Sequence, residues 1–200
     1  HIPPFPPRRS SDLLPEDQFY RLFCAARLQS DDPAFGFRIG AQFSIGSFGL
    51  LSRALMSCAT LREVAQMLER YSVLVLPLVR FSSYETSKHF VVEINALSRY
   101  PILNQSIFEA IMACWDNIVM LLLGQRLSVD KISCCFEAPE YHQRYTELFA
   151  RDVEFAAQRN SIYLKRESAA LPLATANPID AISTREQCDK ELIRSLQTRL

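Results

Sequence analysis

The spacing of the apolar residues changes between residues 60 and 95, and this change restricts the fold more than any other feature of the chain. Over 61–71 apolar side chains recur every three or four positions, which is typical of an amphipathic helix. Over 79–94 they alternate with polar or smaller residues, which is typical of strands that bury one face. The chain must therefore combine helices with a sheet.

Local signals predict where these elements begin and end. Thr60 opens a capping box, which starts a helix, and Pro77 ends it because the residue before a proline disfavours helical angles. A polar turn near 85–87 joins the two strands into a hairpin. Asn104 is expected to cap a long, largely buried helix that ends at Gly124.

The remaining segments complete a mixed pattern of helices and strands. We expect helices over 16–29, from 33 and after Pro139, strands over 132–136, 153–155 and 162–164, and an amphipathic tail over 179–200. Strands and helices do not alternate with the regularity of a doubly wound fold. The sequence predicts the α+β class, with an antiparallel sheet of about four or five strands packed against helices and the long helix at the centre.

Composition favours a single folded domain. The chain has 200 residues, 48% of them hydrophobic, which is enough to bury one substantial core. Residues 1–15 contain five of the eleven prolines, so we expect them to form a disordered or extended arm. The folded domain is then expected over 16–176, followed by the tail at 177–200.

The charge balance argues against direct binding of nucleic acid by this domain. Its 22 basic and 22 acidic side chains cancel, whereas domains that grip phosphates usually carry a basic excess. The longest apolar run, 118–123, is far shorter than the roughly 20 residues that span a bilayer. We therefore expect a cytoplasmic protein that makes no membrane contact.

No sequence pattern predicts catalysis, a metal site or a cofactor. His89 and His142 are the two histidines of the expected domain, and neither accompanies a G-x-S-x-G motif or a metal-binding histidine spacing. The adjacent Cys134 and Cys135 lack the C-x-x-C spacing, and they would point to opposite faces of a strand. We therefore expect a protein that is not an enzyme.

Four of the five glycines lie within residues 35–51, FGFRIGAQFSIGSFGLL. Their spacing matches neither G-x-G-x-x-G nor the phosphate-binding P-loop. Gly36 and Gly40 are four residues apart, so on a helix they would let another element approach closely, and Gly46 with Gly49 can form a turn. We expect this stretch to pack beneath the helix that begins after Thr60.

Four residues in apolar surroundings are candidate ligand contacts. Arg38 lies within the glycine stretch, where its guanidinium can bind the carboxylate of a ligand or of a neighbouring segment. Arg80 and Tyr163 alternate with apolar neighbours in expected strands, and for Arg80 this alternation favours a strand residue that faces water. Trp115 fits either the core or the wall of a cavity.

Two stretches, 31–75 and 134–173, resemble the N-terminal regulatory domain of AraC-type bacterial transcription regulators. The resemblance is to the branch labelled arabinose-binding-like, which includes ornithine-utilisation regulators, and it covers about residues 16–195. It rests on many weak positions in order rather than on one motif. The matching features are Gly36 and Gly40, Gly46-x-x-Gly49, Thr60-Leu61, Phe136 to Pro139, Tyr145, Phe149, Val153, Phe155 and Leu171-Pro172-Leu173.

The resemblance implies a domain that senses a small-molecule effector, often forms a homodimer, and controls a C-terminal DNA-binding domain with two helix-turn-helix motifs. The tail at 177–200 would then be the linker helix toward that domain, which is absent from this chain. Leu192, Leu196 and Leu200 are expected dimerisation contacts, although a helix packed on its own domain fits their spacing equally well.

The resemblance leaves the effector unidentified, and nothing in the sequence points to arabinose. Two rival functions stay open at this stage. The first is a dimerisation module without a ligand, and the second is a small-molecule enzyme whose catalytic groups do not form a recognisable pattern.

Overall fold

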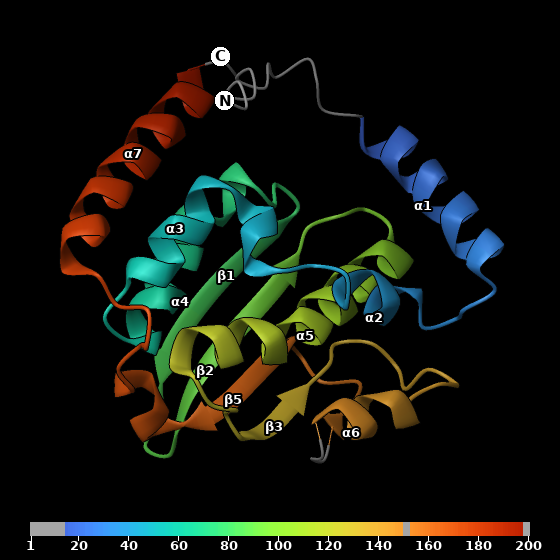
Figure 1. Cartoon of the computed structure of the whole chain (residues 1–200). Coiled ribbons are helices and arrows are strands. Elements are labelled where there is room, and N and C mark those ends of the chain that lie inside the picture. Colours follow the sequence, from blue (N-terminus) through green and yellow to red (C-terminus); the bar gives the residue numbers. More distant parts are fainter. Residues whose placement is uncertain (1–14, 150–152, 198–200) are drawn as a thin grey trace.

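The computed structural model describes residues 15–149 and 153–197 of the chain (Figure 1). The predicted arm therefore lies outside the described residues apart from Pro15. The elements, with η marking 3-10 helices, are α1 (Glu16–Ser30), α2 (Phe35–Gly40), η2 (Ile45–Phe48), α3 (Leu50–Ser57), α4 (Leu61–Tyr71), η3 (Ser72–Leu74), β1 (Val79–Glu85), β2 (His89–Ala96), α5 (Pro101–Leu123), β3 (Val129–Ser133), α6 (Gln143–Phe149), β4 (Val153–Glu154), β5 (Ser161–Lys165), η4 (Arg166–Ala170) and α7 (Pro178–Gln197).

The five strands form one sheet in the order β1-β2-β5-β3-β4, which confirms the predicted α+β class. The hairpin β1–β2 is antiparallel, with Val79 opposite Ala96 and Glu85 opposite Phe90. One detail of the prediction is wrong, because β3 and β4 run parallel. The connection between them contains α6, so the chain crosses back and enters β4 in the direction of β3.

The helices cover one face of the sheet in two tiers (Figure 1). The long helix α5 lies across this face, with α4 beside it against β1, and α2 packs on α5. Helix α7 packs on α3 at one side of the molecule, and α1 lies at the other side (Figure 1). This arrangement encloses the space between the sheet, α4 and α5.

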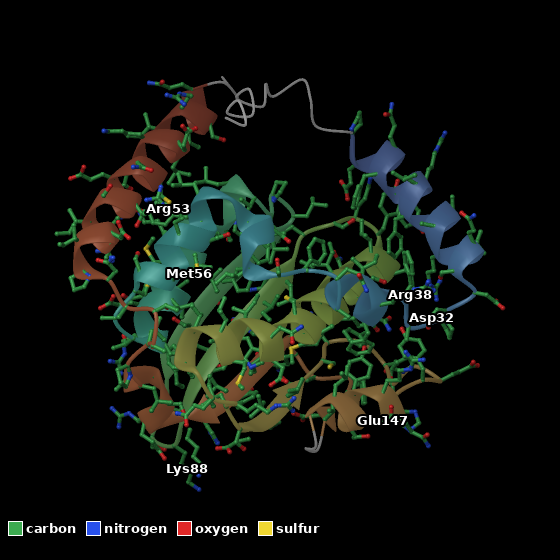
Figure 2. All side chains as sticks on the ribbon, viewed as in Figure 1. Asp32, Arg38, Arg53, Met56, Lys88 and Glu147 are labelled. Carbon is green, nitrogen blue, oxygen red and sulfur yellow. The ribbon has the colours of Figure 1, made fainter. Side chains whose placement is uncertain are left out.

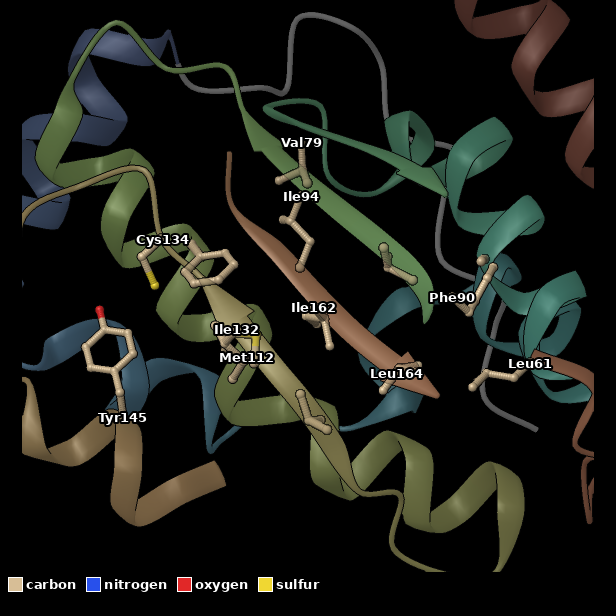
Figure 3. Packing of buried hydrophobic residues seen from close by; sticks show 14 of the residues in the cluster. Leu61, Val79, Phe90, Ile94, Met112, Ile132, Cys134, Tyr145, Ile162 and Leu164 are labelled. Carbon is tan, nitrogen blue, oxygen red and sulfur yellow. The ribbon is translucent and has the colours of Figure 1, made fainter. Parts of the chain in front are cut away.

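The core lies between the sheet and α5. Figure 3 shows strand residues from β2, β3 and β5 together with Met112 of α5 in one cluster. Ile94, Ile132 and Ile162 are completely buried there, as the alternating pattern predicts. By length and hydropathy α5 is the one described helix that could cross a membrane, but its buried residues form the centre of this core.

The glycine stretch packs against α5, not beneath α4 as expected. A Cβ atom on Gly40 would lie 2.2 Å from the carbonyl oxygen of Ala110, and one on Gly36 would lie 2.6 Å from that of Ser106. Both distances are far inside van der Waals contact, so α2 can approach α5 this closely only with glycine at both positions. Gly49 has a φ of 57° and joins η2 to α3, which confirms the predicted turn.

Some predicted boundaries are wrong. The long helix begins at Pro101, and the Asn104 side chain bonds both backbone groups of Ser98 instead of capping the helix. The third strand spans Val129–Ser133, so Cys134 and Cys135 follow it rather than alternating across it. The Thr60 cap is confirmed, because its hydroxyl accepts a hydrogen bond from the Glu63 N–H at 3.3 Å.

Candidate ligand-binding site

An apolar cavity of about 70 Å³ lies between the hairpin β1–β2 and helices α3, α4 and α5. Its position follows from the spacing of apolar residues in the sequence. The alternating residues form the buried face of the hairpin, the residues three or four apart form the apolar stripes of α4 and α5, and these surfaces meet at the cavity. Its walls include Leu61, Ala65, Phe90, Val92 and Trp115. The cavity is therefore a pocket between the sheet and the long helix.

A second apolar cavity, of about 200 Å³, lies between α1, α2 and α5. Phe19 and Phe23 of α1 form one wall, and Leu103 and Ile107 of α5 form another. The two cavities share wall residues, so they adjoin: Phe48, Leu76, Ile111 and Cys114 line both.

The side chain of Trp115, which lines the first cavity, carries an unsatisfied polar atom. Its Nε1 is buried and has no hydrogen-bond partner among the described residues. The neighbouring Cys114 thiol donates to the Ile111 carbonyl at 3.2 Å, and burial raises its pKa to about 11. A buried N–H without a partner costs about 1–3 kcal/mol.

The structure does not bring the four predicted ligand contacts together. Trp115 lines the first cavity, whereas Arg38 is exposed on α2 near Asp32 and lines neither cavity (Figure 2). Arg80 is exposed and donates to the carbonyls of Pro77 and Val79. Tyr163 lies on the opposite face of the sheet. Ligand contact by Arg38, Arg80 or Tyr163 stays a prediction.

A buried carboxylate on α5, which the sequence analysis missed, joins this helix to α6 and to the turn that precedes α6. Glu109 is completely buried, and its Oε1 accepts hydrogen bonds from Tyr145 at 2.7 Å, Tyr141 at 2.8 Å and Gln105 at 3.0 Å. Its Oε2 has no partner among the described residues and faces the space left by the absent side chain of Gly36. The signal available in the sequence was a lone acid in an otherwise apolar stretch of helix.

Burial raises the pKa of Glu109 above its ordinary value of 4.5, and the hydrogen bonds from Tyr145, Gln105 and Tyr141 oppose this rise. The ionised form is therefore less favoured in the folded than in the unfolded chain. As pH rises from 4.5 to the raised pKa, the wild type should lose stability relative to Glu109→Gln, and above that pKa the difference should level off. Urea unfolding of the wild type and of Glu109→Gln across this pH range measures the difference in their free energies of unfolding. Parallel curves would show that Glu109 does not titrate differently on folding.

Helix α7 is fastened to the helices that form the cavity wall. The hydroxyls of Ser57 on α3 and Thr184 on α7 lie 3.3 Å apart. The Asp189 carboxylate on α7 accepts from Arg70 and Tyr71 of α4, each at 2.7 Å. The Tyr71 hydrogen bond and the Arg70 guanidinium hold the pKa of Asp189 below its usual range. Figure 2 shows Arg53 and Met56 on α3, the helix on which α7 packs.

The three leucines predicted for dimerisation have different surroundings. Leu192 packs against the apolar cluster of its own domain, which fits the alternative of a helix packed on its own domain. Leu196 is 56% exposed. Leu200 lies outside the described residues.

A profile of the family described as the arabinose-binding domain of AraC transcription regulators, N-terminal, matches residues 2–173. This match covers most of the chain. The chain belongs to this family. The expected resemblance to the regulatory domain of AraC-type regulators is thereby confirmed.

Relatives of this AraC-type domain are transcription regulators and not enzymes. An ornithine utilization regulator from Pseudomonas aeruginosa is 26% identical over 174 residues, covering 86% of this chain and 50% of the relative. An uncharacterized HTH-type transcriptional regulator from Mycobacterium tuberculosis is also 26% identical, covering 84% and 50%. The chain thus spans about half the length of these curated relatives.

A solved structure confirms the fold of the AraC-type domain. The crystal structure of the transcriptional regulator CdpR from Pseudomonas aeruginosa matches with a TM-score of 0.74, over 90% of this chain and 59% of that chain. The sequence identity is 19%, so this similarity concerns the fold alone.

Proposed function

We propose that this domain senses a small, mainly apolar effector held in the two adjoining cavities, and that binding of the effector changes how firmly α7 is held. The observation that carries the proposal is a buried apolar site whose helical wall also holds α7. Small-molecule sites in proteins are typically concave, mostly apolar and equipped with few polar groups. The two cavities and Trp115 fit that description.

The lining restricts the chemistry of the effector. Apolar side chains form almost all of both walls, so a ligand rich in hydroxyl groups would lose its hydrogen bonds to water on entry. This argues against arabinose, which the family description names. The Nε1 of Trp115 is unpaired and closed to solvent, so we propose that the indole turns toward a ligand that offers one hydrogen-bond acceptor. We therefore propose an apolar molecule with a carbonyl or ether oxygen.

The coupling to α7 follows from shared helices. Leu51 and Leu55 of α3 and Val64 and Leu68 of α4 line the first cavity. The same two helices bind α7 through Ser57, Arg70 and Tyr71. A ligand that shifts α3 against α4 would therefore change how firmly α7 is held, and it can shift this equilibrium only by its difference in affinity for the two states.

The wider role of the domain follows from its family. We propose that α7 is the linker toward a C-terminal helix-turn-helix domain in a longer cytoplasmic protein, which binds DNA only through that domain. A homodimer would form through the outward face of α7, where apolar side chains are exposed to solvent. These are Ile179, Ile182, Ile193 and Leu196, with exposed fractions of 82%, 67%, 57% and 56%.

Matched ligand pairs test the cavity directly. Acetophenone and 2-octanone carry an acceptor, whereas ethylbenzene and n-octane have similar size and carry none. At 100 times its dissociation constant a ketone should add about 2.7 kcal/mol to the free energy of unfolding. The ketones should bind about tenfold more tightly than the hydrocarbons, which corresponds to about 1.4 kcal/mol for the recovered Trp115 hydrogen bond. Thermal-shift measurements give both values.

A blocking variant and its control locate the site. Cys114 lies where the two cavities adjoin, so Cys114→Phe should abolish the stabilisation by the ketones. Asn117→Phe adds the same side chain at an exposed position of α5 and should leave the stabilisation unchanged. Stabilisation that survives in a folded Cys114→Phe variant would place binding elsewhere. No stabilisation by any of the four compounds would favour a dimerisation module without a ligand.

A further inference from the structure

The face of the sheet opposite α5 carries a polar depression that the proposed sensing site does not use. Its volume is about 600 Å³. The strand register builds it from two rows of side chains. One row is Ser82, Glu93, Ser161 and Ser133, on β1, β2, β5 and β3, and the next is Tyr84, Val91, Tyr163 and Lys131. Small hydroxyl side chains on one row and aromatic rings on the next give a trough with a polar floor and a raised side. We call it the outer trough.

Two opposite charges meet at the floor of the outer trough. Glu93 is only 3% exposed, and its Oε2 accepts from Arg159 Nη1 at 2.7 Å and from Ser82 Oγ at 3.3 Å. The Arg159 side chain is 64% exposed, and its Nε and Nη2 donate to no acceptor within the part of the chain that the structure describes. Glu93 is therefore buried, whereas Arg159 keeps its Nε and Nη2 groups available as donors.

The loop that carries Arg159 is fixed by hydrogen bonds on both sides. The N–H groups of Ala156 and Ala157 each donate at 2.9 Å to carbonyls of the segment that follows β3. Ser133 Oγ donates to the Arg159 carbonyl at 2.9 Å, and Asn160 Oδ1 accepts from the Cys135 N–H at 2.8 Å. Ala156 has a φ of 53°, in the left-handed region that non-glycine residues rarely adopt. Such strain persists where the surroundings hold it, and it concentrates at functional sites.

The aromatic side of the trough is also positioned by its neighbours. The Lys131 Nζ lies 5.2 Å from the centre of the Tyr163 ring, and His89 packs edge-on against the same ring. Burial, followed by the charge of Glu93, raises the pKa of Tyr84, so its hydroxyl remains protonated and can donate. The Ser161 hydroxyl donates to no acceptor among the described residues. The trough thus presents cationic donors, neutral hydroxyls and two carboxylates within a small area, those of Glu93 and Glu154, and Glu154 is paired with Lys131 at 2.5 Å.

We propose that the outer trough binds a small zwitterion that carries a carboxylate and an ammonium group close together, as a free α-amino acid does. The ligand's carboxylate would accept from the open Nε and Nη2 of Arg159, since guanidinium groups bind carboxylates through paired donors. Its ammonium would donate to Glu93 and to the neighbouring hydroxyls. The floor has no net charge because Glu93 and Arg159 cancel, so a ligand without net charge leaves no unpaired charge behind. This site lies across the sheet from the cavities and does not depend on the function proposed for them.

Nuclear magnetic resonance of the chain with glycine and L-leucine as probes tests the proposal. Each amino acid is compared with its two halves, an amine without the carboxylate and an acid without the amine. The amino acids should shift backbone resonances of residues 156–163 and the Arg159 Nε–H resonance, and each half should bind at least about tenfold more weakly because one charge contact is lost. Resonances of α3 and α4 should not move.

Three variants make the outcome decisive. Arg159→Gln, at an exposed side chain, should weaken binding at least about tenfold, and Glu93→Gln should do the same if it folds. Arg126→Gln removes another exposed arginine, which pairs with Asp116 of α5 and does not line the trough, and should bind as the wild type does. The proposal is overturned if none of the probes shifts residues 156–163, if binding survives Arg159→Gln, or if L-arabinose, an uncharged polyol, shifts these residues and the amino acids do not.

Discussion

Gly40→Ala should lower the free energy of unfolding by about 3 kcal/mol, since overpacking a close contact costs about 1–3 kcal/mol and sometimes more. The new methyl group would lie 2.2 Å from the Ala110 carbonyl oxygen and 2.6 Å from the Ala110 Cα. Both atoms belong to the backbone of α5 and cannot turn aside as a flexible side chain could. Helix α2 would have to move away from α5, and urea unfolding measures the loss.

Gly46→Ala is the matched control for Gly40→Ala. It lies in the same glycine stretch, and an added Cβ would meet only Ser44 Oγ, at 3.6 Å. We expect it to change the free energy of unfolding by less than about 0.5 kcal/mol, as surface substitutions usually do. Equal losses in the two variants would mean that close packing of α2 on α5 is not what Gly40 provides.

Glu109→Ala should cost about 3 kcal/mol at neutral pH, because it removes the acceptor that serves three buried or partly buried donors. The largest part should come from Tyr145, which is completely buried and would lose the partner of its hydroxyl. Glu109→Gln keeps an acceptor oxygen and should cost less. Glu147→Ala, at an exposed position of α6 labelled in Figure 2, is the control and should be nearly neutral.

A double substitution separates two causes of the stability loss in Glu109→Ala. One is the unpaired Tyr145 hydroxyl, and the other is the cavity left by the removed side chain. If the unpaired Tyr145 hydroxyl causes the loss, Tyr145→Phe should cost less in the Glu109→Ala background than in the wild type, with an interaction energy of about 1–3 kcal/mol. Additive losses in the double variant would assign the effect to packing alone. Chemical denaturation of the four proteins completes the cycle.

The sequence predicted those parts of the fold that local patterns determine. The cap at Thr60, the hairpin over 79–94 and the end of the long helix at Gly124 each follow from a short-range signal, and the structure confirms them. The insertion of β5 between β2 and β3 has no such signal, because it pairs strands that are far apart along the chain. The parallel β3–β4 pair was missed for the same reason.

The candidate site was harder to predict than the fold. Trp115 could be recognised because a tryptophan on an apolar helix either fills the core or lines a cavity. Tyr163 has the same alternating pattern as the core strand residues, yet it lies on the outer face, and sequence alternation cannot tell which face of a sheet the helices cover. Glu109 was overlooked because two of its partners, Tyr141 and Tyr145, lie more than thirty residues along the chain.

Hydrogen exchange of α7 at saturating acetophenone tests the central claim, that occupancy of the cavities changes the docking of α7. Trp115 is the only tryptophan of the chain and lines the first cavity, so its fluorescence reports saturation independently. We predict that exchange slows in α3 and α4 and changes in α7, at the same ligand concentration that saturates the fluorescence. Saturation of Trp115 fluorescence with unchanged exchange in α7 would contradict the claim, as would the absence of any saturable change in fluorescence.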